Sequence, residues 1–153
     1  MTISAEVESL IADAPLSAHL ATAVDDRPHV APVWYGYRDS VLYFITGGRK
    51  LENARRNPRV AVSIEKANGG DVEWNVLLRG TATVSDDPDR IEWASGWIYE
   101  AYDIEADDDQ APDDGSTPDG ETEETDGGSD SNARREAALI EVEIGSSSAT
   151  IYD

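Results

Sequence analysis

The chain has 153 residues, no cysteine and a formal net charge of −20, from 12 Lys and Arg against 32 Asp and Glu. It is long enough to bury a core of its own, and the lack of cysteine excludes disulfides and thiolate metal sites. The negative charge argues against nucleic acid and anionic membranes as partners, because both bind clusters of cations. With no apolar run near ~20 residues and no signal-like segment, we expect one domain over residues 1–153 in the cytoplasm.

The acidic residues are concentrated in one stretch. Thirteen of them lie between Asp103 and Asp130, a span without Lys or Arg. Residues 103–132 are also poor in apolar side chains, which predicts an acidic, flexible insertion. The overall charge favours a halophilic source, where salt screens charge repulsion to ~3 Å at 1 M. An acidic interaction tail in an ordinary cell is the alternative.

Hydrophobic periodicity predicts mostly strands. The expected helices cover residues 4–13, 51–57 and 89–102, and the expected strands cover residues 17–24, 27–37, 40–46, 59–66, 73–84 and 138–144. The break at Arg38–Asp39 is short enough for a hairpin. Gly80 inside a strand indicates a bulge of the kind that helps barrels to close.

The second helix opens on a turn that carries two cations. Arg49 and Lys50 follow Gly47 and Gly48, and they stand at the helix start. The helix dipole disfavours cations there by about 0.3–1 kcal/mol, so the pair calls for an anion to compensate. Backbone N–H groups, glycines and adjacent cations together form a phosphate cradle. The simpler interpretation is that both cations are merely solvated.

The sequence contains few signals for a metal site, a catalytic nucleophile or a dinucleotide site. The two histidines, His19 and His29, have no partners at metal-ligand spacing, and no nucleophile motif or dinucleotide fingerprint is present. If the protein is catalytic, a cofactor is expected to supply the reaction. Trp93 and Trp97 on the third helix are expected to pack in the core or at a dimer interface, with a ligand platform as the alternative.

The segment ATAVDDRPHVAPVWYGYRDSVLYFITGGRKLENARRNPRVAVSI resembles the FMN-binding split β-barrel family related to pyridoxamine 5'-phosphate oxidase. The resemblance is carried by PxVxPVWY, LYFxT, the cationic turn ending in RK, xNxRxNPRV and a later strand ending in RGxA. It implies an α+β, mainly β protein: an antiparallel split barrel with peripheral helices, in which two protomers enclose the flavin.

The resemblance also implies roles for individual residues. Val33, Trp34 and Tyr35 would line the isoalloxazine ring, largely through backbone groups. Ile45 and Thr46 would flank the ribityl chain and the phosphate, Arg49 and Lys50 would bind the phosphate, and Asn75 would supply an amide near the cofactor. The segment IEVEIGSSSATIYD lacks the Arg and His with which the oxidase holds pyridoxal phosphate. Activity on that substrate is therefore not expected.

These observations lead to an expected homodimer with FMN at its interface, acting as an oxidoreductase on a small-molecule substrate. Two alternatives stay open. The same fold could bind the deazaflavin coenzyme and act as a reductase. It could also be a non-catalytic flavin- or haem-binding protein, because no acid/base residue stands out.

Overall fold

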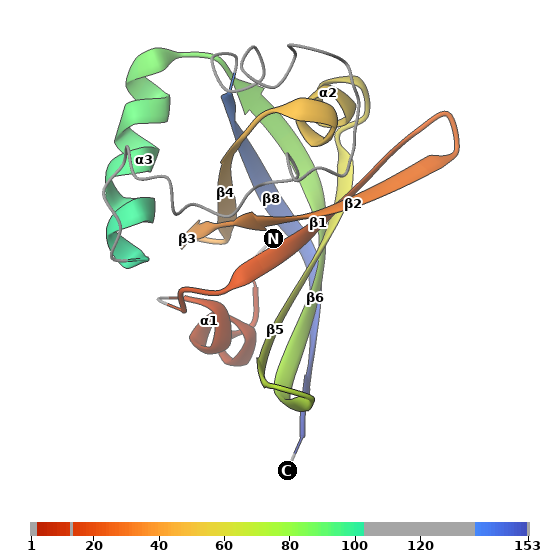
Figure 1. Ribbon diagram of the computed structural model, residues 1–153, viewed down its shortest axis with the longest axis vertical. Coiled ribbons are helices and arrows are strands. Elements are labelled where there is room, and N and C mark those ends of the chain that lie inside the picture. Colours follow the sequence, from red (N-terminus) through yellow and green to blue (C-terminus); the bar gives the residue numbers. More distant parts are fainter. Residues whose placement is uncertain (1–2, 13, 103–136, 153) are drawn as a thin grey trace.

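The computed structural model describes residues 3–12, 14–102 and 137–152, which form one curved antiparallel sheet with helices around it (Figure 1). The helices are α1 (Ala5–Ile11), α2 (Gly48–Arg56) and α3 (Pro88–Ala101), and the strands are β1 (Ser17–Val24), β2 (Arg27–Trp34), β3 (Gly36–Arg38), β4 (Val41–Thr46), β5 (Arg59–Asn68), β6 (Asp71–Ser85) and β8 (Ala138–Ile151). The mainly β split barrel with peripheral helices is confirmed.

No described helix is long and apolar enough to cross a membrane. The acidic range 103–132 lies outside the described residues, so its flexibility and the single domain over 1–153 stay predictions.

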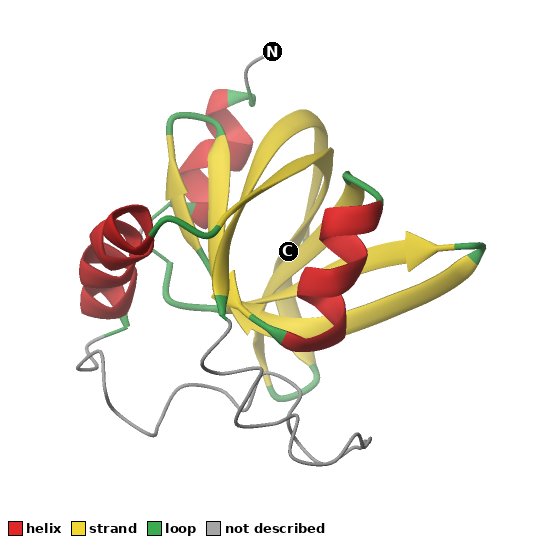
Figure 2. Ribbon diagram, turned by 90° about the horizontal axis from the view of Figure 1, so that it is seen from above, coloured by secondary structure: helices red, strands yellow, loops and turns green. Residues whose placement is uncertain are grey.

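The seven-stranded sheet has the order β2-β1-β5-β6-β8-β4-β3. Its two end strands, β2 and β3, are nevertheless consecutive in the chain and separated only by Tyr35. The sheet must therefore curl until its ends meet, and Figure 2 shows it curled into a barrel with the helices outside. β2 approaches β4 without joining it in a hydrogen-bonded ladder. That gap is the split in the barrel.

The expected strand over residues 27–37 is wrong in one respect, because it is two strands. β2 pairs with β1, with Val24 opposite Arg27, whereas β3 pairs with β4, with Arg38 opposite Val41. The run contains Pro28, Pro32 and Gly36, and β3 begins at Gly36, but these residues do not specify which strand pairs with which. The hairpin after Arg38 is confirmed as the β3–β4 turn.

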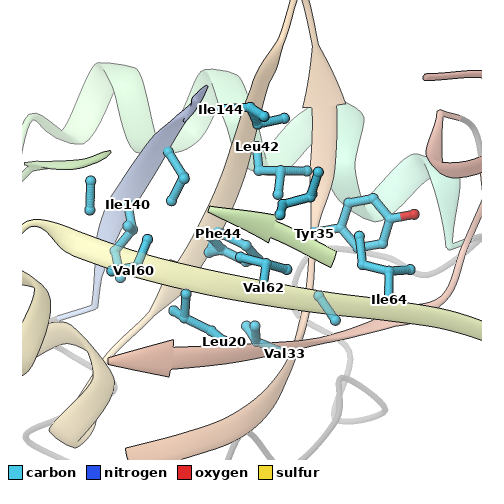
Figure 3. Close-up of a cluster of buried hydrophobic side chains, with 14 of the residues drawn as sticks. Leu20, Val33, Tyr35, Leu42, Phe44, Val60, Val62, Ile64, Ile140 and Ile144 are labelled. Carbon is cyan, nitrogen blue, oxygen red and sulfur yellow. The ribbon is translucent and has the colours of Figure 1, made fainter. Parts of the chain in front are cut away.

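The barrel interior is filled by the inward side of each strand. In the largest cluster of buried side chains, Leu20, Leu42, Phe44 and Ile64 are fully buried. Figure 3 shows Phe44 close to Val62, with Leu20 and Val33 on the neighbouring strands. These side chains come from strands far apart in the sequence, so the core depends on the closed sheet.

Tyr102, just after α3, fastens the point where β2 gives way to β3. Its hydroxyl donates to the carbonyl oxygen of Leu16 at 2.5 Å and accepts from the backbone N–H of Tyr35 at 3.2 Å. Its ring stacks on Trp34 with 4.3 Å between the centroids. Burial raises the pKa of the Tyr102 hydroxyl to about 12, so it stays protonated throughout the neutral range.

A bulge interrupts the pairing of β6, the longest strand, with β8. Arg79 pairs with Ser146 and Gly80 with Ile144, so the register shift expected at Gly80 is present, but the extra residue is Gly145 of β8. A Cβ atom at Gly80 would overlap the carbonyl oxygen of Glu143 on β8. Only glycine allows the two strands to approach so closely at this position.

Replacing Gly80 by Ala is expected to destabilise the protein by about 1–3 kcal/mol, because the added methyl group forces the β6 and β8 backbones apart. Gly96, in the middle of α3, has no atom within 4 Å of an added Cβ. Gly96→Ala should instead stabilise the protein by about 0.5–1 kcal/mol through helix propensity. Chemical denaturation in high salt measures both. Equal effects of the two substitutions would contradict the close approach at Gly80.

Candidate functional site

The first turn of α2 offers an anion site. Its N-cap residue, Gly47, supplies no side-chain hydrogen bond, so the N–H groups of the first turn are not capped from that position. Gly48 has φ +73° and open space around its Cα. Arg49 is exposed, whereas Lys50 is only 3% exposed. A positive helix end with one exposed and one buried cation attracts an anionic group.

Polar side chains continue from this turn into the protein. Asn53 lies one turn after Lys50 on the same buried face of α2 and is 7% exposed. Its Nδ2 donates to Oγ1 of Thr22 on β1 at 3.0 Å. This hydrogen bond joins α2 to β1 and so helps to fix the position of the helix that carries Lys50. Buried polar groups arranged in this way need partners throughout, because each unpaired one costs about 1–3 kcal/mol.

Two polar atoms at this site lack such partners. In the described part of the chain, the buried side-chain atoms without a hydrogen bond are Nδ1 of His29, Oγ1 of Thr46 and Nε1 of Trp97. Thr46 is 2% exposed and directly precedes the Gly47 cap. His29 lies on β2, and burial followed by the charges of Lys50 and Arg49 lowers its pKa. A donor at Thr46, two cations and the N–H groups of a helix start without a side-chain cap suit the oxygens of a phosphate.

Three of the residues that the resemblance implies therefore gather in one place: Thr46, Arg49 and Lys50. The other group, Val33 to Tyr35, has its side chains engaged elsewhere. Val33 is 3% exposed in the core, and the hydroxyl of Tyr35 donates to the carbonyl oxygen of Ile11 at 2.7 Å. The Trp34 ring is stacked on Tyr102, and the Tyr102 hydroxyl bonds both backbone groups of Tyr35. Only backbone groups of Val33 and Trp34 are left to face a ligand.

That backbone is available because β2 is an edge strand. Its described hydrogen-bonded neighbour is β1, and on its other side it faces the split rather than a ladder. An edge strand presents a row of N–H and C=O groups without strand partners. The edge leads from the region of α2 toward Trp34, so a ligand anchored at α2 could extend along it.

Ile45 and Asn75 lie apart from this cradle. Ile45 packs beneath α3 in the cluster that contains Tyr43 and Leu139. Asn75 is near the start of β6, where its Nδ2 donates to the hydroxyl of Tyr152 at 3.2 Å. In Figure 1, α2 lies at one end of the barrel and the β5–β6 turn at the other. The roles implied for both residues stay predictions.

A groove runs across the outer face of the sheet. It has a volume of about 430 Å³ and is lined by residues of β1, β2, β5, β6 and β8. Val30 and Leu77 border it and are 63% and 54% exposed. Asn75 lies two residues before Leu77, so strand alternation places it on the same outer side.

The tryptophans of α3 form a separate aromatic cluster, in which Trp93 is 40% exposed, so its place in a core or a dimer interface stays a prediction. Trp93 and Trp97 contact Tyr43 edge-on at 5.5 and 5.3 Å between ring centroids. The guanidinium of Arg38 lies 3.9 Å from the centre of the Trp97 ring, and Arg90 lies over Trp93. These contacts fasten α3 to β3 and β4.

Thr22, His29 and Asn53 belong to the cradle but had no predicted role there. A polar residue at an inward strand position was the available signal for Thr22, since Ala18 and Leu20 alternate with it. The spacing of Asn53 from Lys50 placed both on one helix face. Sequence spacing addresses His29 only as a metal ligand, and the described residues contain no group of three potential metal ligands.

Comparison with solved structures shows the fold. An FAD-binding protein from Mesorhizobium loti is 22% identical, with a TM-score of 0.64 over 97% of this chain and 95% of that chain. A structure described as an F420 reductase is 23% identical, with a TM-score of 0.61 over 92% and 94%. An FAD-binding protein from Mycobacterium smegmatis is 18% identical, with a TM-score of 0.56 over 98% and 97%.

A search of curated proteins finds no match. The sequence nevertheless matches a family model described as pyridoxamine 5'-phosphate oxidase over residues 4–125, which is most of its length. The fold, the cationic turn and this match agree with one another. The chain therefore belongs to the pyridoxamine 5'-phosphate oxidase family.

Proposed function

We propose that this protein binds FMN through its phosphate at the start of α2 and acts as a flavin-dependent oxidoreductase on a small molecule. The observation that carries the proposal is the cradle itself. Lys50 is buried beside the first turn of α2, and Thr46 Oγ1 is buried without a partner at the same turn. A phosphate would neutralise the cations and accept from the threonine hydroxyl.

The edge of β2 supports a flavin in particular. The polar rim of an isoalloxazine ring carries both donors and acceptors, and the open edge of β2 at Val33 and Trp34 offers both kinds of backbone group. The side chains of Val33 to Tyr35 are held by the core, by Ile11 and by Tyr102, so the backbone is rigid. A rigid edge orients a ring without a loss of entropy at each turnover.

The chemistry would come from the cofactor. When bound, FMN supplies a ring nitrogen, N5, that accepts or donates hydride. The residues of the chain bind the phosphate, orient the ring and limit the access of water. The C-terminal strand β8 carries no Arg or His, so the substrate is not expected to be a pyridoxal or pyridoxamine phosphate.

We further propose that the active form is a homodimer joined through the outer-face groove. An exposed patch with Val30 and Leu77 marks an interaction surface, and a two-fold axis would place the same patch on both partners. A second copy docked there could bring its Asn75 toward the first copy's cofactor. This would reconcile the implied role of Asn75 with its distance from α2 within one chain.

A deazaflavin coenzyme is the second candidate, because the F420 reductase resembles this chain over nearly its whole length. Both coenzymes carry a phosphate on a ribityl-type chain, so the cradle suits either.

Absorption of the purified protein should show the oxidised-flavin bands, and mass spectrometry of the released molecule should give FMN. A deazaflavin spectrum would select the second candidate. A haem Soret band would contradict both and favour the non-catalytic alternative.

Replacing both phosphate cations, as Arg49→Gln with Lys50→Met, should weaken FMN binding by about 2–4 kcal/mol, or roughly 30- to 700-fold. Riboflavin lacks the phosphate, so its affinity should hardly change. Fluorescence titration in molar salt, which screens the net charge of −20, measures both.

Arg56→Gln provides the matched control, because Arg56 is an exposed cation in the last turn of the same helix. It should leave FMN affinity within about twofold, as expected for a screened surface charge. An equal loss for FMN and riboflavin in the double variant would place the phosphate elsewhere.

Leu77→Asp should disrupt the dimer, because it puts a charge at an exposed apolar position that borders the groove, and flavin binding should weaken with it by at least about tenfold. Thr81→Asp is the control, since Thr81 is exposed on β6 but does not line the groove. Light scattering and flavin titration follow both. A monomer that holds FMN stoichiometrically would refute the two-protomer site.

A further inference from the structure

His29 is the polar residue of the cradle that the proposed function leaves unused. It lies on β2 directly opposite Thr22 of β1, whose side chain is 3% exposed and accepts from Asn53 of α2. Paired residues of an antiparallel ladder point to the same side of the sheet, so His29 shares the side of the sheet on which α2 packs. Its Nδ1 is buried and has no hydrogen-bond partner.

We propose that His29 is a proton-dependent ligand of the cofactor phosphate: neutral without the cofactor, it takes up a proton from solvent when the phosphate binds and donates a hydrogen bond to it. The inference rests on the proposed phosphate site at α2. It adds a third cation to Arg49 and Lys50, present only while the anion is bound.

The charges around His29 determine this behaviour. The groups that act on it are Lys50 and Arg49 of α2, both cationic, while β1 presents Thr22, which does not titrate. Together with burial, the two cations lower the pKa of His29, so the imidazole is neutral at pH 7 without an anion. A phosphate dianion within ~4–6 Å reverses the sign of the local field and raises a pKa by roughly 1–3 units.

The pKa of His29 in the two states determines how phosphate affinity changes with pH. At pH values between the pKa of His29 in the free protein and its higher pKa in the complex, phosphate binding is accompanied by uptake of a proton at His29. Phosphate affinity must then rise as the pH falls through the pKa of the complex, and it levels off below the pKa of the free protein. The phosphate's own second ionisation, near pH 6, works in the opposite direction. The useful range therefore lies above about pH 6.5.

The test measures FMN and riboflavin affinities by fluorescence quenching between pH 8.5 and 6.5, at constant high salt. The ratio of the two affinities isolates the phosphate contribution. In the unaltered protein, this ratio should rise roughly three- to tenfold as the pH falls. In His29→Gln, it should stay constant or fall. Arg56→Gln is the control, because Arg56 is an exposed cation in the last turn of α2, and it should keep the rise.

Calorimetry of the unaltered protein gives a second readout that does not depend on how well a variant folds. Titrations at pH 7.5 in two buffers of different ionisation enthalpy count the protons exchanged. FMN should take up a fraction of one proton more than riboflavin does. No uptake, or a pH-dependent ratio that survives in His29→Gln, would overturn the role of His29. Equal FMN and riboflavin affinities at every pH would instead refute the phosphate site, so the two failures are distinguishable.

Discussion

The structure depends on one constraint of connectivity: Tyr35 alone separates two strands that lie at opposite ends of the same sheet. So short a link forces the sheet to curl until β2 and β3 are neighbours. It also prevents their ladder from continuing, because the chain changes partner within a single residue. Tyr102 holds this point from α3 by bonding to Leu16 and to Tyr35. Closure of the barrel and the open edge of β2 are thus two results of the same short link.

The cradle is placed beside that open edge at a cost to stability. Burying Lys50 at the positive end of a helix, next to Arg49 and a partly buried imidazole, opposes both solvation and the helix dipole. The hydrogen bond between Asn53 and Thr22 holds the helix that carries these cations against β1. Local conflicts of this kind are typical of functional sites, where the surrounding structure supplies the stability that the site lacks. Ligand binding and folding stability should therefore be strongly linked in this protein.

The sequence predicted what depends on local pattern. Alternation at Val60, Val62 and Ile64 placed β5 with the correct side inward, and the glycine turn before Arg49 located the start of α2. What it could not show depends on pairing between distant residues. Gly36 marks an irregularity in the run that ends at Tyr37, but it does not show that the chain changes partner at Tyr35. His29 belongs to the cradle because it pairs with Thr22 across the β1–β2 ladder, which the sequence does not show. Asn75 lies near the start of β6, at the end of the barrel away from α2, and this too is evident only from the three-dimensional structure.

The position of β8 has a consequence for how the chain reaches this fold. β8 lies between β6 and β4, yet it follows every other strand in the sequence, and Thr46 pairs with Ala138. During synthesis, β4 and the β3 hairpin can form but have no sheet to join until this strand leaves the ribosome. Contacts between residues so distant along the chain also form slowly. The nascent protein must therefore spend time with two unpaired strand edges and an incomplete core. In that interval a dense negative charge would keep neighbouring chains apart.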